Sequence, residues 1–211
     1  MNPFTQKLMQ LAAGIMFALP LGGCASLSAE PLEGQVLEEG TSKPIANAIV
    51  IVRWDKTYSS FVDTTTVCVH VESALTDVQG RYRLPRWRGK TPDHINTFKT
   101  GYERSQEYFR AKAYLQHNDI LKPFTGGREE RLKYLQRVEG NIRSCRSPEA
   151  GEKNLLPLYR ALYEEAKPLA RTREEQIIRD GFLAAIEKLE LGYKEGMRRA
   201  LERAEKRDRQ P

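Results

Sequence analysis

Two residues separated by one position, His70 and Glu72, have the side chains needed to move protons. They lie in a segment where valines alternate with polar residues, and a period of two is typical of a β-strand. On a strand both side chains lie on one face, where an imidazole and a carboxylate can act as general acid and base. The simpler interpretation is a solvated outer face opposite Val69 and Val71, and we prefer it.

A second group of candidates is the densest basic stretch of the sequence, in which cations are interleaved with Tyr82 and Trp87. The cations are Arg81, Arg83, Arg86, Arg88 and Lys90. One interpretation is an anion-binding patch for lipid phosphate, a polysaccharide or an acidic partner. The other is a solvated strand edge, where charges prevent unwanted pairing with another sheet. The sequence leaves both open, and we prefer the strand edge.

The sequence lacks the motifs of common hydrolases and nucleotide-binding enzymes. His70, His94 and His117 are scattered, and none belongs to the His-Glu-x-x-His pattern of zinc peptidases. There is no Gly-x-Ser-x-Gly motif, and the residues after Gly126-Gly127 are not those of a phosphate-binding loop. We therefore expect no catalytic site, no metal and no cofactor. A hydrolase with an unfamiliar site is the least favoured alternative.

The first 23 residues have the pattern of an export signal. The apolar run over residues 11–21 is shorter than the roughly 20 residues that a membrane-spanning helix needs. It ends in Leu21-Gly22-Gly23-Cys24, which resembles the lipobox of bacterial lipoproteins. This resemblance implies cleavage before Cys24, attachment of diacylglycerol and an N-acyl chain to that cysteine, and a tether over residues 24–30. The alternative is an ordinary secretory signal with an incidental cysteine.

The resemblance also implies a location. Ala25 follows the cysteine, and in Gram-negative lipoproteins the absence of aspartate there favours the outer membrane, with the folded part facing the periplasm. The formal net charge is +6, but an exported protein rarely meets nucleic acid. We therefore expect the membrane, an envelope protein, or an anionic lipid or glycan as partners, and no nucleic acid.

Two further cysteines, Cys68 and Cys145, remain once Cys24 is assigned to lipid. Because an exported chain folds in an oxidising compartment, we expect them to form a disulfide. Closing so long a loop stabilises the fold by about 4 kcal/mol in the chain-entropy model. The alternative is a pair of buried thiols too far apart to join, and their wide separation in sequence does not match a zinc site.

The region before residue 125 has the patterns of β-structure. We expect strands over residues 32–38, 48–52, 67–71 and 81–84, with both faces of the second covered by apolar residues and a long loop over residues 55–66. In the last of these strands Tyr82 and Leu84 face inwards, and Arg81 and Arg83 face outwards.

Three motifs in this region resemble the carboxypeptidase regulatory-like domain, a transthyretin-like β-sandwich. They are Gly34-x-Val36, Lys43-Pro44-Ile45-x-x-Ala48-x-Val50 and Thr76-Asp77-x-x-Gly80-x-Tyr82-x-Leu84, and Gly101-Tyr102 extends the likeness. The resemblance covers residues 31–102 and implies a sandwich over residues 31–125. In carboxypeptidases this domain accompanies a catalytic domain, which this sequence does not contain.

The region from residue 126 to residue 211 has a helical period. We expect helices over residues 128–145, 155–169 and 173–206, each with an apolar stripe that packs on its own domain. The last helix is an exception, because its far end extends beyond what a small sandwich can cover. The predicted fold is therefore α+β, an antiparallel sandwich followed by a helical region. The function that we favour is a lipid-anchored cell-envelope interaction or structural module without catalysis.

Overall fold

The chain forms a mixed α+β fold in a computed structural model that describes residues 30–105 and 117–209. The residues expected to form the signal and most of the tether, with Cys24, lie outside this range. Two sheets face each other, with strand orders β4-β1-β7-β6 and β3-β2-β5. The first contains β1 (Leu32–Glu38), β4 (Arg81–Leu84), β6 (Tyr102–Arg104) and β7 (Asp119–Pro123). The second contains β2 (Ile49–Ser59), β3 (Thr64–Leu75) and β5 (His94–Phe98). All pairs are antiparallel except β1 with β7.

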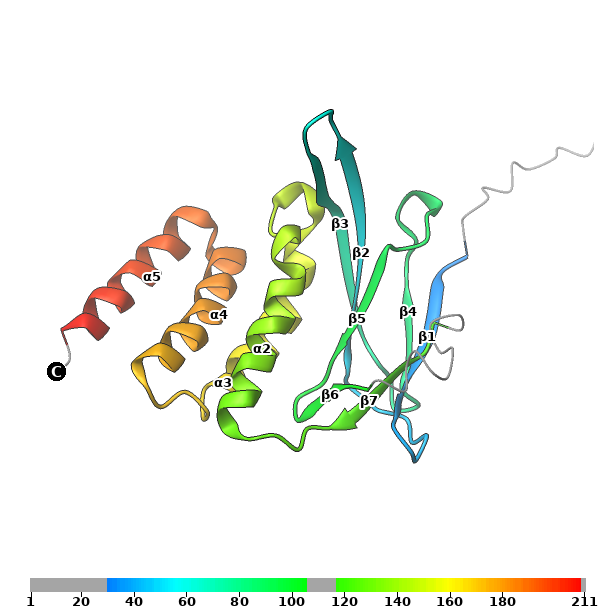
Figure 1. The fold of residues 1–211 in the computed structure, drawn as a ribbon, viewed down its shortest axis with the longest axis horizontal. Coiled ribbons are helices and arrows are strands. Elements are labelled where there is room, and N and C mark those ends of the chain that lie inside the picture. Colours follow the sequence, from blue (N-terminus) through cyan, green and yellow to red (C-terminus); the bar gives the residue numbers. More distant parts are fainter. Residues whose placement is uncertain (1–29, 106–116, 210–211) are drawn as a thin grey trace, which may run out of the picture.

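The β3-β2-β5 sheet lies in the middle of the molecule and is covered on both faces (Figure 1). Ile49 and Ile51 face the helices, whereas Val50 and Val52 face the other sheet. This confirms the expectation that both faces of the second strand are covered. The core between the sheets also contains Leu32, Val36, Trp54, Tyr82, Leu84 and Leu121. Tyr82 and Leu84 are buried while Arg81 and Arg83 are exposed, as the alternation predicts.

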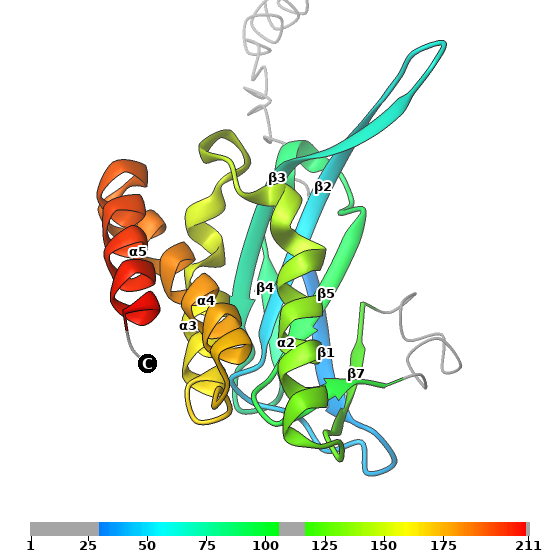
Figure 2. The same cartoon turned by 60° about the vertical axis from the view of Figure 1, so that its left-hand side comes forward.

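Four α-helices follow the sheets in the described part of the chain and form the layers on the far side of the middle sheet (Figure 2). They are α2 (Arg128–Ile142), α3 (Leu156–Ala166), α4 (Arg173–Leu191) and α5 (Tyr193–Asp208). The predicted stripes of α2 and α3 are confirmed, because their leucines pack with Ile51 and Phe98 in one core. Pro157 stands in the first turn of α3, where a missing N–H costs nothing. No helix among the described residues is long and apolar enough to cross a membrane.

The prediction of one continuous helix over residues 173–206 is wrong. Gly192 interrupts it with a φ of +86°, a conformation that side chains rarely adopt, and α5 turns back along α4. Gly196 allows this close packing, since a Cβ atom there would lie 2.7 Å from the Cα atom of Lys188. The two glycines convert a long apolar stripe into a helical hairpin.

The prediction of a loop over residues 55–66 is also wrong. β2 and β3 remain paired as far as Ser59 and Thr64 and form an arm that projects beyond the sandwich (Figure 2). We call residues 55–67 the arm. Backbone pairing and β-forming threonine, tyrosine and valine residues maintain it without a core beneath. The polar composition misled the sequence interpretation because an exposed ladder does not need an apolar face.

A β-bulge at the base of the arm changes which side chains share a face. Trp54 pairs with His70 and Asp55 pairs with Cys68, so that Val69 is an extra residue in β3. Val71 and Cys68 therefore lie in the core under the helices, whereas Val69 packs against the core between the sheets. The predicted common face for Val69 and Val71 is wrong, because an alternation of two does not continue through a bulge.

Cys68 and Cys145 lie at disulfide distance, with 2.03 Å between their sulfur atoms. This is the pairing that the sequence indicates. It connects β3 to the 3₁₀ turn that follows α2, and both residues belong to the core under the helices. The helical layer and the sandwich are thus covalently joined.

Candidate functional site

His70 and Glu72, the predicted proton-transfer pair, lie 3.0 Å apart between Nε2 and Oε1. Their side chains are only 19% and 24% exposed, so the preferred interpretation as a solvated outer face is wrong. Glu72 also accepts a hydrogen bond from the side-chain amide of Asn154. The His70 ring stacks on Trp87 at 5.3 Å with an interplanar angle of 14°. The pair therefore supports an aromatic side chain.

Trp87 in turn supports one of the predicted anion-binding residues. The guanidinium of Arg88 lies over the Trp87 ring at 4.7 Å. Arg88 has a φ of +49°, which is uncommon for a residue with a side chain. Stacking of this kind leaves the N–H groups of a guanidinium free to bind a carboxylate or phosphate.

The five cations of the predicted anion-binding patch do not form one surface. Arg81 and Arg83 extend from the outer side of β4, and Arg83 is paired with Glu33 at 3.4 Å. Arg86 is half-buried. Arg88 and Lys90 instead line a cleft of about 660 Å³ at the base of the arm.

This cleft, which we call the arm cleft, contains balanced charges. Three cations (Lys56, Arg88 and Lys90) and three acids (Asp55, Asp93 and Glu149) line it, beside Trp54, Trp87, Tyr58 and Ser147. Asp55 is already held by Arg53 and His94, each at 3.2 Å. Within the described ranges, the cleft's three cations form no ion pair with any acid.

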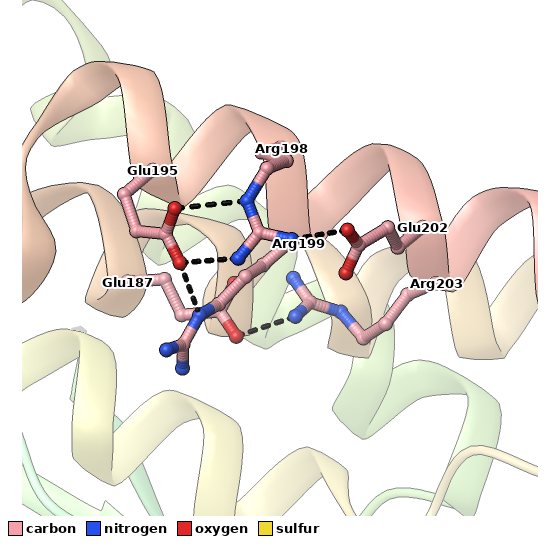
Figure 3. A network of polar contacts seen from close by, with 6 residues as sticks. All are labelled: Glu187, Glu195, Arg198, Arg199, Glu202 and Arg203. Carbon is pink, nitrogen blue, oxygen red and sulfur yellow. Dashed lines mark hydrogen bonds and ion pairs between the residues drawn. The ribbon is translucent and has the colours of Figure 1, made fainter.

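The α4–α5 hairpin carries a second group of charges, which pair with one another (Figure 3). Arg198 lies between Glu195 and Glu202, and Arg199 also donates to Glu195. Hydrogen bonds from Arg198 and then Arg199 lower the pKa of Glu195 to about 2. The charged side of α5 is therefore largely neutralised within the hairpin.

Two further ion pairs hold α5 against α4. They join Arg203 to Glu187 and Arg207 to Asp180. No apolar side chain of α5 belongs to either core of the described structure. Among the residues of α5 whose burial the structure describes, only Gly196 is buried. The helix is therefore attached mainly by charge pairs and a close backbone approach.

The apolar residues of α5 remain exposed to solvent. Tyr193, Met197 and Leu201 are 65%, 43% and 59% exposed, and their spacing of four places them on one side of the helix. We call these three residues the apolar face of α5. Beside it lies a groove of about 280 Å³, whose lining includes the apolar or aromatic residues Leu155, Tyr159, Leu189, Tyr193 and Met197 and the charged residues Arg146, Glu152 and Lys188. The sequence anticipated that the last helix would extend beyond its core, but not that Gly192 would fold it back.

No family model, curated protein or solved structure matches this chain in the comparisons made. No group of three or more His, Cys, Asp or Glu side chains suited to a metal ion occurs in the ranges that the structure describes.

Proposed function

We propose that this chain is a lipid-anchored cell-envelope protein that acts as a non-catalytic interaction module and docks a protein partner on the apolar face of α5. One observation carries the proposal: the apolar side of α5 is exposed while its charged side is paired internally. Within the described residues α5 contributes no apolar side chain to either core, and an exposed apolar side of this kind is typical of a surface that binds another protein.

The chemistry of this face favours a protein over an anionic lipid or glycan as its occupant. Four of the six cations of α5, namely Arg198, Arg199, Arg203 and Arg207, already have carboxylate partners, so most of the positive charge of this helix is paired within the protein. The adjacent groove offers a place for an apolar side chain of the partner, which is how amphipathic helices are commonly recognised. Tyr193 and Met197 are residue types that interface cores favour.

The anchor and the type of sandwich are parts of the same proposal. The anchor is supported by Leu21-Gly22-Gly23-Cys24, and the outer membrane by Ala25 after the cysteine. Two facing sheets with the Pro44 and Asp77–Gly80 turns are consistent with a transthyretin-like, carboxypeptidase regulatory-like sandwich. Replacing Cys24 with Ala should release the protein into the soluble fraction, and retention in the membrane would refute the anchor.

The partner can be identified by capture of the lipidated protein from intact cells after chemical crosslinking. We expect mass spectrometry to recover one envelope protein in nearly equal amount. The double variant Met197→Glu/Leu201→Glu should lose it while keeping the thermal unfolding temperature, because neither side chain is part of the core. Equal recovery of the partner with the natural chain and with the double variant would place the interface elsewhere on the molecule.

A further inference from the structure

The arm ends in two apolar side chains that contact almost nothing. Phe61 is 110% exposed and Val62 is 94% exposed, at the turn between β2 and β3. The polar groups of this turn pair with each other: Asp63 donates from its backbone to Ser60 Oγ and accepts from the backbone of Thr64. The tip therefore presents apolar side chains on a turn whose hydrogen bonds are largely internal.

Side chains change in character along the arm from the tip to the base. Tyr58 is 51% exposed and lies three residues before Phe61. The ammonium group of Lys56 lies over the Tyr58 ring at 4.7 Å. Arg88 and Lys90 follow at the arm cleft, which Lys56 and the acids Asp55, Asp93 and Glu149 also line. An order of apolar, aromatic and then cationic side chains is what a membrane surface favours, with acyl chains deepest and lipid phosphates outside.

The chain enters the fold at this same end of the sandwich. β1 begins at Leu32, which pairs with Leu84 at the end of β4. The segment after β4 contacts the base of the arm, where the Trp54 side chain donates a hydrogen bond to the backbone carbonyl of Lys90. In Figure 1 the arm projects upwards from the middle sheet, and β1 begins at the upper end of the outer sheet. From Cys24 to Glu30 the chain spans at most about 20 Å when extended. A lipid on Cys24 therefore keeps this end near the bilayer.

We propose that this end of the molecule faces an anionic lipid surface, with Phe61 and Val62 inserted among the acyl chains and Lys56, Arg88 and Lys90 at the lipid phosphates. The inference rests on the lipid anchor of the proposed function but not on the α5 partner. The guanidinium of Arg88 lies over the Trp87 ring, and this stacking leaves its N–H groups available to a phosphate. The arm then sets the orientation of the anchored protein, and the α4–α5 hairpin remains clear of the membrane.

The depth of the arm can be measured on the lipidated full chain in vesicles of phosphatidylglycerol and phosphatidylethanolamine. A nitroxide is attached to Phe61→Cys, and the control is Val78→Cys, an exposed position in the turn before β4. We expect the label at position 61 to collide with oxygen more often than with a water-soluble nickel complex, and the label at position 78 to show the reverse. Equal accessibility at the two positions would overturn the proposal.

A second measurement separates the arm from the anchor. The Cys24→Ala chain should bind vesicles of phosphatidylglycerol and phosphatidylethanolamine weakly, and high salt should weaken this binding further. It should bind phosphatidylcholine vesicles less than these anionic vesicles. Phe61→Asp/Val62→Asp should reduce this binding by about tenfold or more, as should Arg88→Gln with Lys90→Gln, whereas Arg83→Gln should not. Binding that survives both double variants would overturn the proposal even if Cys24 carries lipid. Binding that depends on them would support the contact of this end with lipid even if Cys24 carries none, so that failure of the anchor and failure of the arm are distinguished.

Discussion

Arg131 and Glu165 form a buried ion pair that joins α2 to α3, with 2.7 Å between Nε and Oε1. Arg131 also donates to the backbone carbonyl of Tyr102, and Glu165 accepts from the backbone of Gly101. The pair therefore connects two helices to the turn between β5 and β6. Their side chains are only 5% and 10% exposed, so water cannot replace either partner.

Arg131→Ala should lower the free energy of unfolding by about 3–5 kcal/mol, because it leaves the Glu165 carboxylate buried without a counter-charge. Urea unfolding followed by circular dichroism measures the loss. Arg160→Ala is the matched control, because its pair with Glu190 is exposed and should contribute less than about 1 kcal/mol. Similar losses in the two variants would show that Arg131 does not connect the layers.

Glu175 should make the free energy of unfolding depend on pH in the acidic range. A hydrogen bond from Arg128, followed by those from the backbones of Thr172 and Arg171, lowers its pKa from 4.5 to about 2. Because the folded-state pKa is depressed, the stabilisation is complete above pH 4.5 and is lost as the pH falls towards 2.

The variant Glu175→Gln should therefore unfold at a lower temperature than the natural chain at pH 6, and the difference should vanish near pH 2. Thermal unfolding at a series of pH values provides the measurement. Glu174→Gln, at an exposed neighbouring position in the first turn of α4, should leave the pH profile unchanged. A constant difference at every pH would contradict the assignment.

Gly196→Ala should separate α5 from α4, since the new Cβ atom would meet the Lys188 backbone at 2.7 Å. We expect faster hydrogen exchange throughout α5 with little change in the main unfolding transition, because the apolar side chains of α5 are outside both cores. Gly140→Ala, in an open position on α2, should instead stabilise the chain by about 1 kcal/mol. Unchanged exchange in α5 would show that the close approach is not required.

Removal of the disulfide should weaken the contact between β3 and the end of α2. The double variant Cys68→Ala/Cys145→Ala should lose about 2–4 kcal/mol of unfolding free energy, since the bridge closes a long loop. Cys24→Ala is the control for the loss of a cysteine and should leave the unfolding midpoint unchanged. A loss no larger than that of the control would mean that the bridge does not stabilise the fold.

Much of the fold could be predicted because its cores follow simple periods. Ile49 to Val52 lie in a strand covered on both faces, and Leu132, Leu135 and Ile142 form one face of a helix. What could not be predicted depends on single residues that interrupt a period. The bulge at Val69 changes a face, and Gly192 reverses the direction of a helix. The pattern of apolar residues does not predict a bulge or a break in a helix.

The candidate surfaces were harder to predict than the fold. The sequence identified Arg88 and Lys90, but grouped them with Arg81 and Arg83, which extend from another part of the surface. The stacking of His70 on Trp87 joins positions 17 residues apart, and no local pattern indicates it. Phe61 and Val62 lie in the segment that we expected to be a loop, so the sequence did not indicate that they are exposed at the tip of a paired arm.

The most direct test of the interaction module is a photo-crosslinking amino acid at position 197 of the lipidated protein in intact cells. Val78, which is 75% exposed in the turn before β4, is the control position. We predict one adduct of defined mass from position 197 and none from position 78, and we expect the crosslinked partner to be an envelope protein. The same adducts from both positions, or none from position 197, would contradict it.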